Sequence, residues 1–422
     1  MNASFFAPKI AAGLLASFAL LACQRGPEAS DPKTAPPTAA EGEKAPAGID
    51  IDELLKREAT GLSDQVIKAP DASWSVTVSA AGAPTVQVIE DMLVIEVPIG
   101  GEAKVRCQVF PKPIDPGGTL WEILANIRKS LEFARVAPAG VHVVAGAPAA
   151  FVDTIYVTDS ERGRLAGNLK LAIHAADPRP VLCLHDEMGY RSTFEQVSKS
   201  FFGSFKSNTP PDLKPTYLEI SKTRIDDVDV GFSITRYVPG QNKGELTYMH
   251  QSTQFVPASP KDLNMEDSYK VLTMDTKGRL TKGVWIESEG GELTVEVTAT
   301  RLGEGKYAYE GEVSGKQVKG SFEAKTGIAT PLETMALIKK KLSGGGGFSE
   351  KVLEYYPSLD PTAVIPVTYS HNAGAAPREV QVRLGDHQMT VQVDEQGMPA
   401  SALFPVGKKT LRISREFVQG KL

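Results

Sequence analysis

Histidine and carboxylate side chains are the first residues to examine for chemistry. The six histidines lie at positions 142, 174, 185, 250, 371 and 387, and no pair has the spacing of metal ligands. His185 is followed by Asp186 and Glu187, the one local cluster of titratable groups, which could supply half of a metal site. No further ligand lies nearby in sequence, so we interpret these three as strand-end residues that cap the following turn and helix. The sequence predicts no metal site.

Other motifs of catalysis or ion binding are incomplete. The acidic run 226–229 lacks the third acidic ligand, the glycine and the distant glutamate of a calcium loop, so a hairpin tip is the better interpretation. A Gly-x-Ser-x-Gly elbow is absent. Glycines 344–347 follow a predicted helix instead of opening one, so they cannot hold a phosphate. We therefore predict no catalytic residues, no cofactor and a protein that is not an enzyme.

Cys107 and Cys183 lie within strand-like apolar runs, where an activated thiolate is not expected. In an oxidising compartment two such cysteines are more often paired than free. A disulfide requires the two strands to be adjacent, which one sequence cannot show. Pairing is the expectation, and two free thiols are the alternative.

The N-terminus has the pattern of an export signal. Lys9 is the only charge before Arg25, and the apolar run 10–22 is too short to span a bilayer as a helix. The run ends in Leu20-Leu21-Ala22-Cys23, which resembles the lipobox of bacterial lipoproteins. An ordinary secretory signal whose cysteine is incidental is the alternative.

The lipobox resemblance implies cleavage of a 1–22 signal peptide after Ala22 and acylation of Cys23 by palmitate-type chains. Two or three such chains hold a protein durably on a membrane. Gln24 stands where an aspartate would commonly signal inner-membrane retention, so the resemblance favours the outer membrane, facing the periplasm. Residues 23–48 are rich in Pro and Ala and should form a disordered tether.

Length and charge restrict the remaining chain. About 370 residues exceed what one core usually supports, so two or three domains are expected. The formal charge of −5 has interspersed signs and argues against a nucleic-acid partner. The expected partners are the membrane, reached through the lipid anchor, and a lipid or another protein.

Residues 49–207 read as a first, α+β domain. Helices are expected at 50–59, from Thr119 with Glu122 as capping partner, and from Ser192 with Glu195 in the same role. Strands are expected at 73–79, 85–90, 92–98, 103–110, 141–144, 150–158, 165–174 and 181–188. This order predicts an antiparallel sheet with helices on both faces. It resembles the PsbP-like α/β/α sandwich, a group whose members mostly bind other proteins or act as assembly factors.

Residues 210–422 read as a large, curved antiparallel β meander with one helix. Apolar residues alternate with polar ones over 293–300 and 307–313. The turns beside these runs are Gly290-Gly291, Gly303-Glu304-Gly305 and Ser314-Gly315. Thr330-Pro331-Leu332-Glu333 is a capping box that opens the helix, and residues 343–348 form a flexible hinge after it.

A long curved sheet with one helix resembles the LolA-like half-barrels of periplasmic lipid carriers. In such folds the concave face takes an acyl chain, which would make Trp285, Tyr307, Tyr309 and Phe322 lining residues. The simpler interpretation is that these aromatic residues pack the core of the sheet.

Three functions are compatible with these observations. We favour a non-enzymatic envelope lipoprotein that binds a hydrophobic ligand or a partner protein. A scaffolding lipoprotein of an envelope complex is the second interpretation. A hydrolase with a dispersed site that acts on peptidoglycan or lipid is the third.

Overall fold

The computed structural model describes residues 54–89, 91–160, 163–210 and 214–422. The predicted signal peptide, Ala22, the lipid-attachment residue Cys23 and the tether 23–48 lie outside the described residues. Of the predicted helix 50–59, Leu54 and Leu55 are described and are helical. Among the helices in the described part of the chain, none has both the length and the apolar composition needed to cross a bilayer.

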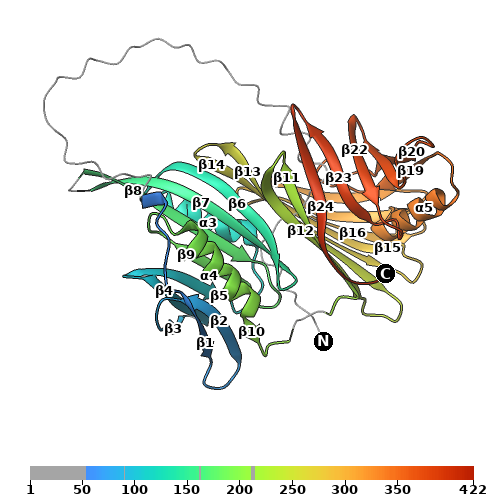
Figure 1. The fold of residues 1–422 in the computed structure, drawn as a ribbon. Coiled ribbons are helices and arrows are strands. Elements are labelled where there is room, and N and C mark those ends of the chain that lie inside the picture. Colours follow the sequence, from blue (N-terminus) through green and yellow to red (C-terminus); the bar gives the residue numbers. More distant parts are fainter. Residues whose placement is uncertain (1–53, 90, 161–162, 211–213) are drawn as a thin grey trace, which may run out of the picture.

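An antiparallel sheet of seven strands forms the centre of the N-terminal half (Figure 1). Its strands, in spatial order, are β3 (Thr85–Ile89), β4 (Met92–Gly100), β5 (Ala103–Val109), β9 (Val181–His185), β8 (Gly163–His174), β7 (Ala147–Ser160) and β6 (Glu132–Val144). Buried residues alternate along β5, where Ala103, Val105, Cys107 and Val109 are buried. This period of two is the mark of a strand with one face in a core.

One face of the seven-stranded sheet is covered by helix α4 (Arg191–Ser204) together with a small sheet. That sheet has the order β1 (Ser63–Lys68), β2 (Trp74–Ala80) and β10 (Lys206–Ser207). Phe194, Val197 and Phe201 of α4 pack with Val76 and Val78 of β2 in one core. The predicted apolar face of this helix is therefore its buried face.

A second antiparallel sheet contains fourteen strands and makes up most of the C-terminal half. It consists of two meanders that meet where β11 pairs with β24. The first runs through β11 (Tyr217–Ile225), β12 (Val228–Pro239), β13 (Leu246–Ser259), β14 (Asp262–Met274), β15 (Leu280–Glu289), β16 (Glu292–Gly303), β17 (Lys306–Val313) and β18 (Lys316–Glu323). The second runs through β19 (Phe348–Glu354), β20 (Ile365–His371), β21 (Glu379–Leu384), β22 (His387–Val393), β23 (Pro399–Val406) and β24 (Lys409–Gly420).

The alternation read from the sequence matches the burial of these strands. Val295, Val297 and Ala299 of β16 are buried, while Glu296 between them is exposed. Gly290 and Gly291 both have positive φ in the turn before β16, as the hairpin requires. The predicted helix is α5 (Pro331–Ser343), which crosses from β18 to β19 and begins with the expected capping box of Thr330 and Glu333.

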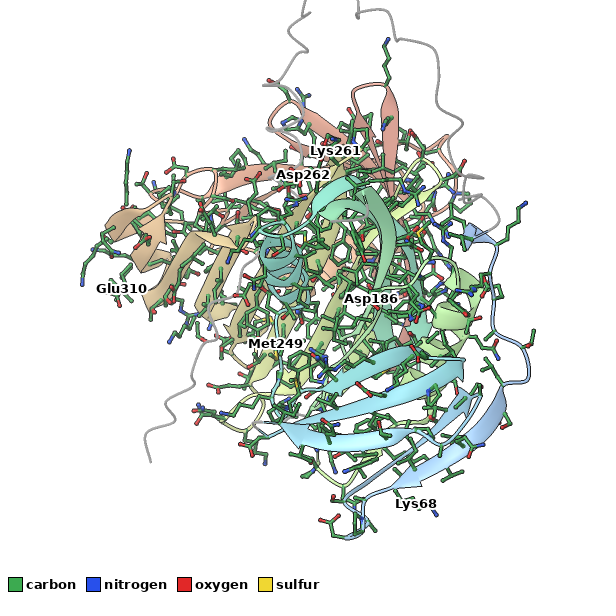
Figure 2. All side chains as sticks on the ribbon, turned by 90° about the vertical axis from the view of Figure 1, so that its left-hand side faces the viewer. Lys68, Asp186, Met249, Lys261, Asp262 and Glu310 are labelled. Carbon is green, nitrogen blue, oxygen red and sulfur yellow. A yellow bond between two sulfur atoms is a disulfide. The ribbon has the colours of Figure 1, made fainter. Side chains whose placement is uncertain are left out.

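The two large sheets share a core. Leu120 and Leu124 of helix α3 (Pro116–Ile127) lie in one apolar cluster with Phe133 of β6, Phe232 of β12 and Phe255 of β13. The β13–β14 turn, which contains Lys261 and ends at Asp262, also reaches the N-terminal half (Figure 2). There Arg128 bonds Asp262 at 2.5 Å. The second face of the seven-stranded sheet is thus buried by strands of the other sheet.

The predicted α/β/α sandwich is therefore wrong, because the chain is dominated by antiparallel sheet. Helices do not cover both faces of the seven-stranded sheet. Helix α3 is wedged between that sheet and β14, and β12 to β14 supply the rest of the cover. A sequence predicts that a face is apolar but not which element will cover it. The element order that resembled the PsbP-like group leads here to a different packing.

A cavity within the fourteen-stranded sheet

The fourteen-stranded sheet curls so that β20 to β23 face β11 to β15 across a cavity, which we call the sheet cavity. Its volume is about 320 Å³, within the range of small-molecule sites, and it is partly open to solvent. Helix α5 forms one side through Thr334, Met335 and Ile338. Gly397 approaches this helix closely, since a Cβ there would lie 2.6 Å from the carbonyl oxygen of Met335. Its φ of +82° also favours glycine.

One wall of the sheet cavity is apolar. It is formed by alternate residues of three neighbouring strands of the second meander, and their side chains belong to a single hydrophobic cluster with Ile338 of α5. The residues of this wall are Val367, Val380, Val382, Leu384, Met389, Val391 and Val393. A wall of this kind has no hydrogen bonds to offer, so it suits a hydrocarbon group.

The opposite wall is polar, and the strand register explains its arrangement. Ser221, Ser233, Ser252 and Ser268 lie directly opposite one another across β11 to β14 and form a row of hydroxyls. All four are buried, and three of them line the cavity. A second row lies two residues away from the first on each strand. It consists of Glu219, Thr235, His250, Lys270 and Trp285. The pairing of strands thus collects polar groups that are far apart in sequence.

Two glutamates of the cavity have donors of their own. Glu219 accepts a hydrogen bond of 2.6 Å from the Tyr217 hydroxyl and lies 3.4 Å from Arg415. Burial raises the pKa of Glu219, while the phenol and the guanidinium oppose that change. Glu354 accepts from the hydroxyls of Tyr356 at 2.6 Å and Tyr369 at 2.7 Å. Both oxygens of Glu354 therefore have a donor, and both contacts of Glu219 are made by its Oε2.

Lys270 has no such partner. Its Nζ lies 5.5 Å from the centre of the Tyr356 ring, a cation–π contact. Among the described residues, no carboxylate oxygen lies within the 4.0 Å of an ion pair with this amine. Burial lowers the pKa of Lys270, and the charges of Glu354 and Glu287 oppose this. The amine is held in the cavity without an acceptor.

His250 lies beside Lys270 on the next strand. Its Nδ1 is 3.0 Å from the Thr235 hydroxyl, and its ring stacks on Tyr248 with centres 6.2 Å apart. Burial and the charge of Lys270 lower the pKa of His250 to about 4, so the ring is neutral at pH 7. This histidine can donate or accept one hydrogen bond but supplies no charge.

Trp285 lies on the other side of Lys270. Its indole packs edge-on against Tyr355, with ring centres 4.9 Å apart, and its side chain is 4 % exposed. The indole Nε1 is buried and has no hydrogen-bond partner among the residues that the structure describes. A buried N–H group without an acceptor is uncommon, because it loses its bond to water and gains nothing.

The four aromatic residues proposed from the sequence come together in one cluster. Tyr307 and Tyr309 each stack on Phe322, which stacks in turn on Tyr355. Trp285 lines the sheet cavity, whereas Tyr307, Tyr309 and Phe322 pack behind it in the core of the sheet. Sequence reasoning missed the polar wall. Its serines and threonines read as the solvent side of a strand, and no signal in one strand shows that the sheet curls over them.

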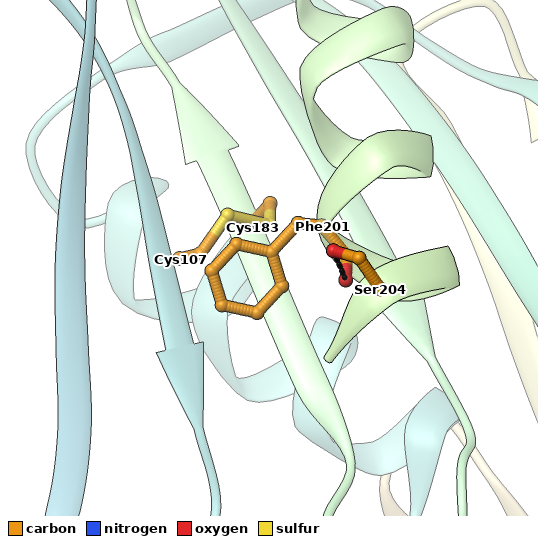
Figure 3. The surroundings of a disulfide bond; sticks show 4 residues. All are labelled: Cys107, Cys183, Phe201 and Ser204. Atoms are coloured by element: carbon orange, nitrogen blue, oxygen red, sulfur yellow. Dashed lines mark hydrogen bonds between the residues drawn. A yellow bond between two sulfur atoms is a disulfide. The ribbon is translucent and has the colours of Figure 1, made fainter. Parts of the chain in front are cut away.

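Other residues considered from the sequence have structural partners. Cys107 and Cys183 form a disulfide between directly paired positions of β5 and β9, so the predicted pairing is confirmed (Figure 3). The ring of Phe201 from α4 lies beside it. His185 is buried with Nδ1 2.7 Å from the Lys104 carbonyl oxygen, and the described residues contain no group of three metal-binding side chains. Asp229 bonds Arg224 at 2.6 Å and the Val141 amide at 3.0 Å, so it connects the two halves.

Comparison with known proteins finds no matching family model and no matching curated protein. Three solved structures are similar to parts of the chain. A β-barrel-like protein with the domain of unknown function DUF1849 from Brucella abortus is 15% identical, with a TM-score of 0.38, over 49% of this chain and 98% of that one. A protein from Bacteroides thetaiotaomicron is 11% identical, with a TM-score of 0.22, over 38% of this chain and 52% of that one. A DUF1089 family protein from Pseudomonas aeruginosa is 13% identical, with a TM-score of 0.21, over 44% of this chain and 89% of that one.

Proposed function

We propose that the protein binds a small amphipathic molecule in the sheet cavity and does not convert it chemically. The observation that carries this proposal is the division of one cavity into an apolar wall on β20 to β22 and a polar wall on β11 to β15. A hydrocarbon group would remove the valine and leucine side chains from water, and a polar head would satisfy the hydroxyl and N–H groups opposite. The volume of about 320 Å³ is at the lower end for ligand sites, which suits a single chain.

Binding of the uncharged apolar dye N-phenyl-1-naphthylamine tests this proposal. The dye fluoresces when it leaves water, so the full chain should increase its emission in a saturable manner. Ala402→Phe places a ring in the cavity and should weaken the binding by about tenfold or more. Leu403→Phe is the matched control, because the neighbouring residue on β23 does not line the cavity and should leave binding unchanged.

Three outcomes of this experiment would reject the proposal. They are no saturable binding, equal binding by both variants, or a loss of binding that follows unfolding instead of cavity volume. Thermal unfolding of each variant separates the last case. Met389→Trp, which fills the cavity from a second strand, should reproduce the effect of Ala402→Phe in a folded protein. Native mass spectrometry of gently extracted protein would identify a ligand that remains bound.

We also propose that this binding protein is held on the outer membrane, facing the periplasm, by acyl chains on Cys23. The lipobox-like Leu20-Leu21-Ala22-Cys23 supports this. Growth with labelled palmitate should label the wild-type chain in its native host, and Cys23→Ser should abolish the label and release the protein from the membrane fraction. Recovery of unlabelled protein that still begins with Met1 would refute the anchor.

A further inference from the structure

The polar wall of the sheet cavity contains two residues with N–H donors that have no acceptor among the described residues. His250, Lys270 and Trp285 lie directly opposite one another on β13, β14 and β15, and we call them the donor row. In antiparallel sheets, side chains at such positions have Cβ atoms about 5 Å apart. Within the described part of the chain, Lys270 has no ion pair and the Trp285 Nε1 has no hydrogen-bond partner. Two neighbouring residues of the cavity wall thus carry N–H donors that no described acceptor engages.

The surrounding carboxyl groups do not satisfy these donors. Glu354 binds two tyrosine hydroxyls, and Glu219 binds Tyr217 and Arg415. The charges of Glu354 and Glu287 reach Lys270 through space and favour its protonated form. Among the described residues, no carboxylate oxygen lies within 4.0 Å of the Lys270 amine. A half-buried amine and a buried indole N–H without acceptors each cost free energy in the empty protein. Both would be relieved by one group that has two acceptor oxygens.

We propose that the ligand's head group is an oxyanion, a carboxylate or a phosphate ester, which the Lys270 amine and the Trp285 indole N–H bind while the acyl chain lies on the apolar wall. This inference rests on the proposed function and specifies the ligand class. An oxyanion has at least two oxygens and accepts from several donors at once, and its charge would stabilise the ammonium form of Lys270. An alcohol or ester head lacks that charge. Hydrogen bonds to charged groups are roughly twice as strong as neutral ones.

The test compares ligands that have the same chain and different heads. Palmitic acid, hexadecyl phosphate, hexadecanol and methyl palmitate would each displace N-phenyl-1-naphthylamine from the full chain. The two anions should displace the dye at concentrations lower by about tenfold or more than the two neutral ligands. The ratio between palmitic acid and hexadecyl phosphate distinguishes a carboxylate site from a phosphate site.

Variants of the donor row should change the preference for the two anions over the two neutral ligands. They should leave the affinity for the neutral dye unchanged. Lys270→Gln should remove most of the preference for anions, and Lys270→Arg should retain it because the charge remains. Trp285→Phe keeps an aromatic ring and should reduce the preference in part, because one donor is lost. Lys319→Gln is the matched control, since Lys319 is exposed on β18, is paired with Glu310 and lies outside the cavity.

The outcomes separate this inference from the proposed function. If the dye binds in the cavity but the wild-type protein binds anions and hexadecanol equally, the oxyanion site is rejected and the amphipathic site stands. A preference for anions that survives in Lys270→Gln also rejects it. If the dye does not bind at all, the proposed function itself fails. If Lys270→Gln does not fold, the preference of the wild-type protein for anions over neutral ligands still tests the oxyanion site.

Discussion

Asp115 and Asp267 form a buried pair of carboxyl groups between the two halves of the molecule. They share a hydrogen bond, and Asp267 also accepts from the Gly118 amide at 3.0 Å and from the Thr253 hydroxyl at 2.6 Å. Asp267 therefore caps helix α3 from a strand of the other sheet. Burial and then the charge of Asp115 raise the pKa of Asp267 well above its ordinary value.

The sign of this shift predicts how stability depends on pH. Because the folded state holds a proton more tightly than the unfolded state, the contribution of the pair is complete below about pH 4 and is lost as pH rises through the raised pKa. Asp115→Asn removes one charge and keeps Asp267 as the cap. Between pH 5 and pH 7.5 the free energy of unfolding should fall less in Asp115→Asn than in the wild type. The difference between the two falls should be about 1 kcal/mol or more.

Urea unfolding of both proteins at the two pH values measures this difference. Asp64→Asn, on an exposed position of β1, is the control and should leave the pH dependence of stability unchanged. An identical pH dependence in Asp115→Asn and the wild type would mean that the two carboxyl groups do not share a proton.

The disulfide offers a second test at the scale of single residues. Cys107 and Cys183 are separated by 76 positions in sequence, so their bond restricts a long loop of the unfolded chain. Loss of a native disulfide typically costs about 2–5 kcal/mol. The double variant Cys107→Ala, Cys183→Ala should therefore unfold at lower urea concentration than the oxidised wild type. Reductant should lower the midpoint of the wild type alone, and a wild-type midpoint that does not respond to reductant would contradict this.

Helix α5 is the element that completes the sheet cavity, and its N-terminus is anchored twice. The Thr330 hydroxyl accepts from the Glu333 amide at 3.2 Å and donates to the Gly278 carbonyl oxygen at 2.8 Å, where it is buried. Thr330→Ala should lower the free energy of unfolding by about 1–2 kcal/mol, as loss of a cap and of a buried hydrogen bond would. Ser343→Ala at the exposed C-terminal end of the same helix should cost much less.

Thr330→Ala also tests whether α5 shapes the ligand site. Met335 and Ile338 line the cavity, so a frayed first turn should also weaken dye binding, by a few-fold, at temperatures where the protein is still folded. Chemical denaturation gives the first quantity and fluorescence titration the second. A stability loss without any change in dye affinity would separate α5 from the site.

Local sequence signals predict elements better than they predict what covers them. The box of Thr330 and Glu333 is local in sequence, and the structure contains it as predicted. For α4 the expected partner Glu195 bonds Lys199 instead, and Glu58 accepts from the Ser192 and Thr193 amides. Helix α3 starts at Pro116, before the expected Thr119, and Asp267 caps it from 149 positions away. Caps that come from distant segments leave no pattern in sequence.

The candidate site shows the same limit. Alternation along 293–300 predicted a half-buried strand correctly, because that pattern is complete within the strand itself. The donor row needs three strands in register, and its members are ordinary polar positions when each strand is read alone. Aromatic residues drew attention instead, and three of the four pack in the core around Tyr355. Register and curvature are long-range properties, which a single sequence does not encode in any local pattern.

At the scale of the whole molecule, the two large sheets are joined by an apolar core instead of a thin interface. Phe255 of β13 and Phe232 of β12 are at most 1 % exposed, and they pack in one cluster with Leu120 of α3 and Phe133 of β6. Domains joined by a small polar interface tend to unfold separately, whereas a shared dry core links their unfolding. We therefore expect the seven-stranded and fourteen-stranded sheets to lose structure together.

Phe255→Ala tests this coupling because it removes a buried ring from the C-terminal side of the core. The loss should be about 3–5 kcal/mol, as for other buried phenylalanines. If the core is shared, hydrogen exchange should accelerate in β6 to β8 as well as in β12 to β14, although the changed residue lies in only one sheet. Leu302→Ala, at a position that is 61% exposed on β16, should change neither region. Faster exchange confined to β12 to β14 would show that the halves unfold independently, and the sheet cavity could then be studied in the C-terminal half alone.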